Sequence, residues 1–235
     1  MHALVHRLPA AAPQDASALH AAIDAGTIKP EAIVAVLGKT EGNGCVNDFT
    51  RGYATAALKG AIAARLGQTP DAVERRVAFV MSGGTEGGLS PHWIVFEARE
   101  APPPPAGAPK ALAIGVAFTP PFAPEAIGRR DQVAATADAV RRAMTAARID
   151  QPGDVHYVQV KCPLLTKARI AEAAARGRDV ATHDTYVSMG YSRGASALGW
   201  RRRWVRSTTR RRATARCAAI YRCIRASPAP RPASS

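Results

Sequence analysis

The sequence lacks the features that would place the protein in a membrane or direct it out of the cell. No apolar run among its 235 residues approaches the length of a membrane-spanning helix. Residues 1–13 form a short mixed segment, without the basic and then apolar layout of a signal peptide. We therefore expect a cytoplasmic protein. Hydrophobic residues make up 47% of the chain, which is enough for the core of one large domain or two small ones.

Cysteine is also scarce. The chain has four cysteines, and they show no tight spacing of the kind that is typical of a zinc site. The pattern therefore predicts neither a structural metal nor a disulfide framework. The four positions are Cys45, Cys162, Cys217 and Cys223.

Acidic residues and lysine are absent from the last part of the chain. Residues 200–235 contain eleven arginines but no Asp, Glu or Lys. The whole chain has a net charge of +14, so removing these eleven charges leaves +3 for residues 1–199. A strongly basic protein would suggest nucleic acid or another anionic partner. Here residues 1–199 are close to neutral, and the basic character belongs to the tail.

Residues 1–100 alternate between strand-like and helix-like patterns, which predicts an α/β fold. Short apolar runs predict buried strands at 32–37, 77–81 and 93–97. Apolar residues at helical spacing predict helices at 16–25 and 53–66, with a glycine-rich loop at 38–47 before the second helix.

A second unit is predicted after a proline-rich segment at 101–109, which cannot hold regular structure and is interpreted as a linker. The patterns beyond it predict strands at 110–119 and 155–161. They also predict helices at 131–147 and 170–177, and a loop at 184–199 that runs into the start of a helix.

The two units repeat one arrangement of charged residues. In each unit a predicted strand delivers a lysine, Lys39 in the first and Lys161 in the second. Each unit then reaches an arginine that is followed by glycine and other small residues, Arg51 and Arg193. Such internal similarity indicates a duplicated half-site. We therefore expect the active site to lie where the repeats meet.

A lysine that faces a loop serine has a recognised chemistry. Serine becomes a nucleophile when a neighbouring base takes its proton, and an amine serves as that base when burial or nearby cations favour its neutral form. The turn at Ser82 and Gly83 offers a hydroxyl and unobstructed backbone N–H groups to a developing oxyanion. Arginine adds a planar fork of donors for carbonyl oxygens.

Each of these features also has a plainer interpretation. A lysine at a strand end is most often a solvated surface residue, and a Ser-Gly-Gly turn is most often only a turn whose glycines adopt positive φ. An arginine before glycine near a helix is commonly an exposed terminal residue. The chemistry of these residues alone is therefore compatible with two interpretations, a Ser/Lys hydrolase and a protein without catalytic activity.

Three long strings narrow the choice. GKTEGNGCVNDFTRGYA at 38–54 and MSGGTEGGLSPH at 81–92 resemble first-repeat signatures of the cyanuric acid hydrolase and barbiturase family. SMGYSRGASALG at 188–199 resembles the second-repeat arginine motif of that family. The resemblance implies three homologous α/β repeats around a pseudo-threefold axis. Here it implies one complete repeat (1–100) and one incomplete repeat (110–199) on either side of the linker (101–109), and we expect residues 200–235 to form a basic, disordered tail.

The resemblance also implies a site to which each repeat contributes a Ser, a Lys and an Arg. In the family, the second-repeat serine is the nucleophile and its lysine is the base, while the other Ser/Lys pairs polarise ring carbonyls. The second-repeat serine is missing from this chain. By motif, the catalytic residues are Lys161, Ser82 and Lys39, and the substrate-binding residues are Arg51, Ser82, Gly83 and Arg193.

The implied reaction is the opening of the s-triazine ring of cyanuric acid, giving carboxybiuret and then biuret and CO₂. The family resemblance implies no cofactor and no metal in this chemistry, and it implies a homotetramer for the intact enzyme. We expect a small cyclic imide as the partner and neither a membrane nor nucleic acid. Because the nucleophile and the third repeat are missing, we expect this chain to turn over little or no substrate.

Two alternatives from other classes stay open. The first is barbiturase, which has the same fold and acts on the pyrimidine ring of barbituric acid. The second is a non-catalytic binding protein whose basic tail contacts nucleic acid through phosphates. Cyanuric acid and barbituric acid are both planar rings with several carbonyl groups, and the same arginines and serines can bind either one. The residues therefore do not show which of the two is the substrate.

Residues 200–235 are predicted to be translated out of frame. If each codon of the tail begins one base earlier, synonymous codons allow a string that continues the helix of Arg193 and ends in STSAGIE. This ending parallels MSGGTEG around Ser82 and puts the missing serine at the position of Arg231. Sequencing the gene tests the idea, and a gene with no frame that encodes this string contradicts it. A genuine basic arm would instead give salt-dependent DNA binding that is lost on truncation after Gly199.

Overall fold

The structure of the protein is a computed structural model that describes residues 2–45, 47–85, 87–102, 105 and 111–204. The chain divides into two compact units, Met1–Phe118 with Arg142–Gln151, and Thr119–Arg141 with Pro152–Ser235. Each unit is described by itself. The predicted linker at 101–109 lies mostly outside the described residues, and so do residues 205–235 of the basic tail. The division into repeats at 1–100 and 110–199 stays a prediction.

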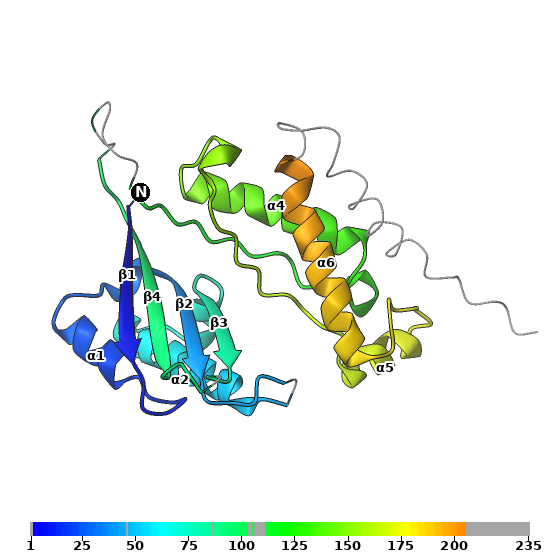
Figure 1. Cartoon of the computed structure of the whole chain (residues 1–235), viewed down its shortest axis with the longest axis horizontal. Helices are drawn as coiled ribbons and strands as arrows, with labels where there is room; N and C mark the ends of the chain where they lie inside the picture. The colour runs from blue at the N-terminus through cyan, green and yellow to red at the C-terminus, as the bar shows by residue number, and fades with distance from the viewer. Residues whose placement is uncertain (1, 46, 86, 103–104, 106–110, 205–235) are drawn as a thin grey trace, which may run out of the picture. The chain divides into compact units, whose positions relative to one another are not determined.

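The first unit is built on a four-stranded sheet with the order β1-β4-β2-β3 (Figure 1). Its strands are β1 (His2–Pro9), β2 (Ile33–Thr40), β3 (Ala78–Gly83) and β4 (His92–Arg99). β4 runs antiparallel to both β1 and β2, whereas β2 and β3 are parallel. The sequence predicted the last three strands but missed β1. β1 is an edge strand whose side chains alternate between exposed and more buried positions, so it has no continuous apolar run.

Three helices complete the first unit: α1 (Ser17–Asp24), α2 (Phe49–Leu66) and α3 (Pro70–Glu74). α2 is the crossover between the parallel strands β2 and β3, a connection that parallel pairing requires. The side chain of Asp48 caps its first turn by accepting a hydrogen bond from the backbone N–H of Thr50. Gly67 ends the helix in the left-handed conformation with φ 61°. The cap places the helix start four residues before the predicted Tyr53.

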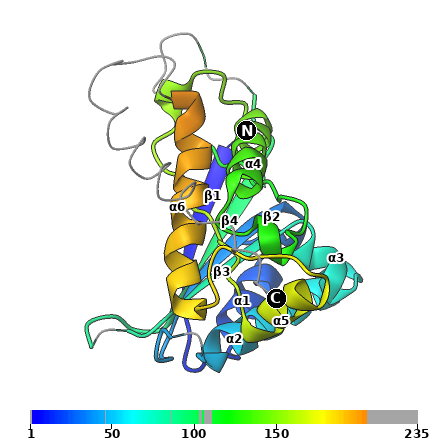
Figure 2. The same cartoon turned by 90° about the vertical axis from the view of Figure 1, so that its right-hand side faces the viewer.

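The three helices lie beside the sheet (Figure 2), and their buried apolar residues form one core with those of the sheet. Trp93 on β4 is fully buried in it, and its indole N–H donates to the backbone oxygen of Asp15 at 2.7 Å. The ring lies so close to Gly38 on β2 that an added Cβ there would be 2.7 Å from it. Other fully buried core residues are Leu19, Ile33, Val36, Leu58, Ile62 and Val73. Gly38 directly precedes Lys39, so this packing lies next to the predicted site.

The second unit is mainly helical among its described residues. It contains α5 (Lys167–Ala175), α6 (Thr185–Trp204) and most of α4 (Arg130–Ala146), a helix that crosses the boundary between the units. The helices predicted at 131–147 and 170–177 are confirmed, with α5 beginning three residues earlier. The loop predicted at 184–199 was wrong. Asp184 accepts a hydrogen bond from the N–H of Val187 at 2.9 Å, and this cap starts α6 at Thr185.

The strands predicted at 110–119 and 155–161 were also wrong. Residues 111–119 and 155–161 form no strand in the described part of the chain. A strand is stabilised by a neighbour that completes its hydrogen-bond ladder, and an apolar pattern does not supply that neighbour. Between β1 and the first of these segments there is one ladder-like contact, in which the N–H of Ala3 donates to the oxygen of Leu112 at 2.9 Å.

A buried glutamine joins α4 to α6 in the second unit. The side-chain amide of Gln132 donates to Ser192 Oγ and Ser196 Oγ, both at 2.9 Å, and its oxygen accepts from the N–H of Gly128 at 2.7 Å. Closer to the end of α6, an added Cβ on Gly199 would lie 2.6 Å from Thr136. The serine and glycine face of α6 is therefore the face that packs on α4.

None of the helices in the described part of the chain is both long and apolar enough to cross a membrane.

Glu97 is a buried carboxylate on which the first unit depends. It has no exposed surface and accepts hydrogen bonds from His6 at 2.6 Å, from the N–H of Lys29 at 2.8 Å and from Arg99 at 2.8 Å. Burial works to raise the pKa of Glu97, but the hydrogen bonds from Lys29, Arg99 and His6 outweigh it, so the pKa is lowered. The carboxylate is therefore held in its charged form.

Replacing Glu97 by Gln is expected to lower the free energy of unfolding at pH 7 by about 2 kcal/mol, because charged hydrogen bonds are lost in a buried setting. The lowered pKa means that this stabilisation is present above the usual glutamate pKa of 4.5 and is lost as the pH falls through the folded-state pKa. Urea unfolding of both proteins should thus give a difference that shrinks below pH 4.5. The matched control is Glu74→Gln, whose side chain at the end of α3 is exposed, and its effect is expected within about 0.5 kcal/mol of the parent. Equal effects of the two substitutions would contradict the role of Glu97.

Candidate functional site

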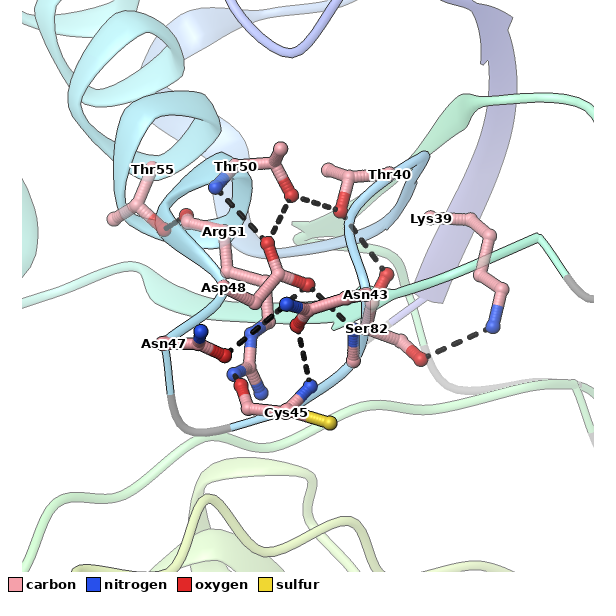
Figure 3. A network of polar contacts seen from close by, with 11 residues as sticks. Lys39, Thr40, Asn43, Cys45, Asn47, Asp48, Thr50, Arg51, Thr55 and Ser82 are labelled. Carbon is pink, nitrogen blue, oxygen red and sulfur yellow. Dashed lines mark hydrogen bonds and ion pairs between the residues drawn. The ribbon is translucent and has the colours of Figure 1, made fainter.

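Lys39 and Ser82 lie side by side at the carboxyl ends of the parallel strands β2 and β3. The pairing register puts the two residues opposite each other. Lys39 Nζ donates to Ser82 Oγ at 3.2 Å (Figure 3). Lys39 is half-buried, while Ser82 is exposed. The carboxyl ends of parallel strands are a common place for ligand sites, because the loops that follow them gather there.

The loop after β2 is folded around the side chain of Asp48. One carboxylate oxygen accepts from the N–H of Gly44 at 2.9 Å, and the other accepts from the N–H of Thr50 at 3.0 Å. Within the loop, Asn43 Oδ1 accepts from the N–H of Cys45 at 2.8 Å. These side-chain contacts replace the backbone hydrogen bonds that a loop lacks, so the loop has a defined conformation.

Arg51 is held by the same loop (Figure 3). Its Nε lies 3.7 Å from a carboxylate oxygen of Asp48, and its Nη2 donates to the backbone oxygen of Cys45. The side chain is partly exposed, whereas the side chain of Asp48 is fully buried. Arginine has five N–H donors, and these two contacts leave others available to a ligand.

Thr40 connects this loop to the strand end that carries Ser82. Its hydroxyl is 2.9 Å from the hydroxyl of Thr50 and donates to the backbone oxygen of Ser82 at 3.4 Å. Thr40 directly follows Lys39 in β2 and is buried. One continuous polar network therefore includes the segments that carry Lys39, Arg51 and Ser82.

Asp48 is charged at the centre of this network. Burial works to raise the pKa of Asp48, but hydrogen bonds from Thr50 and Gly44, together with the charge of Arg51, outweigh it, so the pKa lies below its usual value. A buried carboxylate that accepts several hydrogen bonds keeps its charge in this way.

Gly83 fits the site because it has no side chain. An added Cβ would lie 1.7 Å from a carboxylate oxygen of Asp48 and 3.0 Å from the backbone nitrogen of Gly44. The sequence predicted a backbone contact between Gly83 and the substrate, which stays a prediction. The structure adds a different reason for glycine here, namely the close approach of the loop that carries Asp48.

The second set of predicted residues belongs to the second unit. Lys161 is exposed and lies in an irregular segment, so its predicted place at a strand end was wrong. Arg193 is exposed on α6. Its neighbours Ser192 and Ser196 are buried and belong to the face of α6 that packs on α4. The structure brings Lys39, Ser82 and Arg51 together in the first unit. The meeting of the two sets at one site stays a prediction.

Sequence reasoning missed Asp48, Thr40 and Thr50. A signal for Asp48 was present, because an aspartate at the start of a helix is a common N-terminal cap. The threonines carried no comparable signal, since their contacts depend on the distance between β2 and α2. No group of three His, Cys, Asp or Glu side chains that could hold a metal ion occurs among the residues that the structure describes.

Replacing Gly83 by Ala is expected to lower the free energy of unfolding by about 2 kcal/mol, because the new methyl group overlaps Asp48 and forces the loop to move. Gly60, in the middle of α2, is the matched control, since an added Cβ there has no neighbour within 4 Å. Gly60→Ala should instead raise stability by up to about 1 kcal/mol through helix propensity. Denaturant unfolding measures both. If Gly83→Ala is as stable as Gly60→Ala, the close packing of Asp48 and Gly83 is wrong.

The comparisons with known proteins agree with the resemblance found in the sequence. Residues 4–201 match the family model described as "Amidohydrolase ring-opening protein". A cyanuric acid amidohydrolase of Ectopseudomonas oleovorans is 62% identical over 199 residues, which are 85% of this chain and 55% of the relative. A cyanuric acid amidohydrolase of Pseudomonas sp. (strain ADP) is 57% identical over 198 residues, 84% of this chain and 54% of the relative.

Solved structures give the same result for the fold. A structure titled as a cyanuric acid hydrolase that arose by structural concatenation matches with a TM-score of 0.79 and 56% identity, over 85% of this chain and 55% of that one. The hydrolase from A. caulinodans matches with a TM-score of 0.77 and 56% identity, over 85% and 54%. The chain thus spans about half the length of the relatives that it matches, which fits one complete and one incomplete repeat. The predicted α/β fold class is confirmed, and the chain belongs to the family of ring-opening amidohydrolases.

Proposed function

We propose that the protein derives from an enzyme that opens the ring of cyanuric acid. We further propose that its first unit contributes Lys39, Ser82 and Arg51 to the substrate site. The observation that carries the proposal is the hydrogen bond of 3.2 Å between Lys39 Nζ and Ser82 Oγ, at adjacent strand ends and within one polar network with Arg51. Both curated relatives named above are cyanuric acid amidohydrolases, and this supports the choice of substrate.

The hydrogen bond between Lys39 and Ser82 supports a polarising role for the pair. Lys39 Nζ donates to Ser82 Oγ, and the hydroxyl hydrogen of Ser82 then donates to a ring carbonyl oxygen. Each donor in such a chain strengthens the next, because the first withdraws electron density from the oxygen of the second. The carbonyl carbon then becomes a better electrophile. Arg51 binds a second ring oxygen with its remaining N–H groups.

The proposed reaction proceeds through an acyl intermediate. A serine oxygen adds to a ring carbonyl, the C–N bond breaks, and the departing nitrogen takes the proton that the lysine base removed from the serine. Water hydrolyses the ester to carboxybiuret, which loses CO₂ to give biuret. By family resemblance the attacking serine is that of the second repeat, with Lys161 as base and Arg193 as a binding residue. We propose little or no turnover by this chain, because loss of a nucleophile costs several orders of magnitude in rate.

Barbituric acid is the alternative substrate, because its ring offers a similar set of carbonyl oxygens. The family resemblance favours a cytoplasmic protein without a cofactor that assembles as a homotetramer when intact. Sedimentation of the full chain measures its assembly directly.

The full chain is expected to bind cyanuric acid without forming biuret, as measured by calorimetry and by product analysis. Ser82→Ala and Arg51→Ala should each raise the dissociation constant about tenfold, because each removes a hydrogen bond to the ligand. The matched control is Lys59→Ala, which removes a positive charge from the same helix as Arg51 but pairs with Glu74 away from the network. Tighter binding of barbituric acid would favour barbiturase. Binding of neither ring would contradict the proposed function, and rapid biuret formation would contradict the proposed inactivity.

A further inference from the structure

Asp48 contacts three segments of the first-unit site, namely the loop after β2, the start of α2 and the end of β3. Its carboxylate accepts from Gly44 in the loop and from Thr50 in α2, and it faces Arg51 at 3.7 Å. The carboxylate also lies against Gly83 at the end of β3. Its side chain has no exposed surface, so it cannot itself contact a substrate.

We propose that Asp48 is a positioning residue, which fixes the guanidinium of Arg51 relative to the strand end that carries Ser82. The inference rests on the proposed function only for the identity of the ligand that Arg51 and Ser82 bind. The arrangement of Asp48, Arg51 and Ser82 is a property of the fold and can be tested without a ligand.

The carboxylate of Asp48 lies closely packed between two glycines. An added Cβ on Gly42 would lie 2.0 Å from one carboxylate oxygen, and one on Gly83 would lie 1.7 Å from the other. Glycine at both positions therefore allows the loop and the strand end to close on the carboxylate from two sides. Close packing and hydrogen bonds to both oxygens stabilise the rotamer that the structure shows.

Hydrogen bonds connect Asp48 to β2 and β3, the strands that carry Lys39 and Ser82. The hydroxyl of Thr50 donates to Asp48 at 2.5 Å and lies 2.9 Å from the hydroxyl of Thr40. Thr40 in turn donates to the backbone oxygen of Ser82. A shift of the carboxylate would thus be felt at β2 beside Lys39 and at β3 beside Ser82. Buried networks of this kind are rigid when every member has its partner.

The charge of Asp48 also orients Arg51. The carboxylate faces Nε, and the loop oxygen of Cys45 accepts from Nη2, so the plane of the guanidinium is fixed from two directions. The residue three positions before Arg193 is Gly190, so no carboxylate stands there in the place that Asp48 has before Arg51. The lowered pKa of Asp48 keeps its charge present at neutral pH. Arg51 is therefore oriented before a ligand arrives, which reduces the entropy lost on binding.

The test uses Cys45 as a reporter in the full chain. Its backbone N–H donates to Asn43 Oδ1 at 2.8 Å and its backbone oxygen accepts from Arg51, so the hydrogen-exchange rate of this N–H reports on the order of the loop. NMR spectroscopy of the labelled chain resolves this N–H from the others. Asp48→Asn keeps the size of the side chain but removes its charge and one acceptor. We expect it to raise the exchange rate of the Cys45 N–H about tenfold through local opening.

The matched control is Asp15→Asn. Asp15 also anchors a loop, accepting from the N–H groups of Ala11 and Ser17 at 2.8 and 2.9 Å, and its pKa is likewise lowered by these hydrogen bonds. It has no contact with Arg51. Its replacement should leave the rate at Cys45 within about twofold of the parent. Equal rates for the two variants would overturn the inference.

A double-mutant cycle separates positioning of Arg51 from a general loss of stability. If Asp48 acts through Arg51, then Asp48→Asn combined with Arg51→Ala should raise the exchange rate of the Cys45 N–H little more than Arg51→Ala alone. The same non-additivity is expected in the dissociation constant for cyanuric acid. Fully additive effects on the rate at Cys45 would overturn the inference. A parent chain that binds no cyanuric acid but shows the coupling at Cys45 would contradict the proposed function and leave the role of Asp48 supported.

Discussion

The parallel pairing of β2 and β3 is the constraint on which the site depends. It sets Lys39 level with Ser82, although the two residues are far apart in sequence. Parallel neighbours also require a crossover, and here that crossover is α2. The start of the helix is consequently brought to the same edge of the sheet as the two strand ends. One topological choice thus delivers a lysine, a serine and an arginine to one place.

The polar network around Asp48 fixes the conformation of the loop and strand ends at this edge of the sheet. A site built only from loops would lose backbone hydrogen bonds on folding, and Asp48 replaces them with contacts to the loop and to the helix. The carboxylate also balances the charge of the arginine beside it. A buried network with unmatched members would destabilise the fold, whereas one in which each oxygen has a donor fixes a single geometry. The first unit contains a second buried carboxylate of this kind. Glu97 on β4 accepts hydrogen bonds from β1, from β4 and from the segment before β2, at the other end of the sheet.

Much of the first unit could be predicted from sequence, because its buried strands are continuous apolar runs and its helices have clear periodicity. The edge strand β1 could not, since half of its side chains face solvent. The second unit was predicted less well. Its segments at 111–119 and 155–161 have strand-like patterns, but a ladder needs a partner strand that no local pattern can specify. The start of α6 was missed because its first turns are polar and small, and its packing is decided by Gln132 on another helix.

The site shows the same division. Motifs gave Lys39, Ser82 and Arg51, yet the register that joins the first two follows from sheet pairing and not from any string. The role of Asp48 as a helix cap could have been predicted from the sequence. Its second role depends on glycines that approach it from the loop and from β3, and this is visible only in three dimensions.

Trp93 lies against Gly38, the residue before Lys39, so the hydrophobic core reaches to within one peptide of the lysine. Any methyl group gained at position 38 would push on an indole that is pinned through its nitrogen to Asp15. The strand would have to yield instead, and it would carry the amine with it. Position 38 therefore accepts no side chain unless Met81 and Trp93, the two side chains that face it, also change.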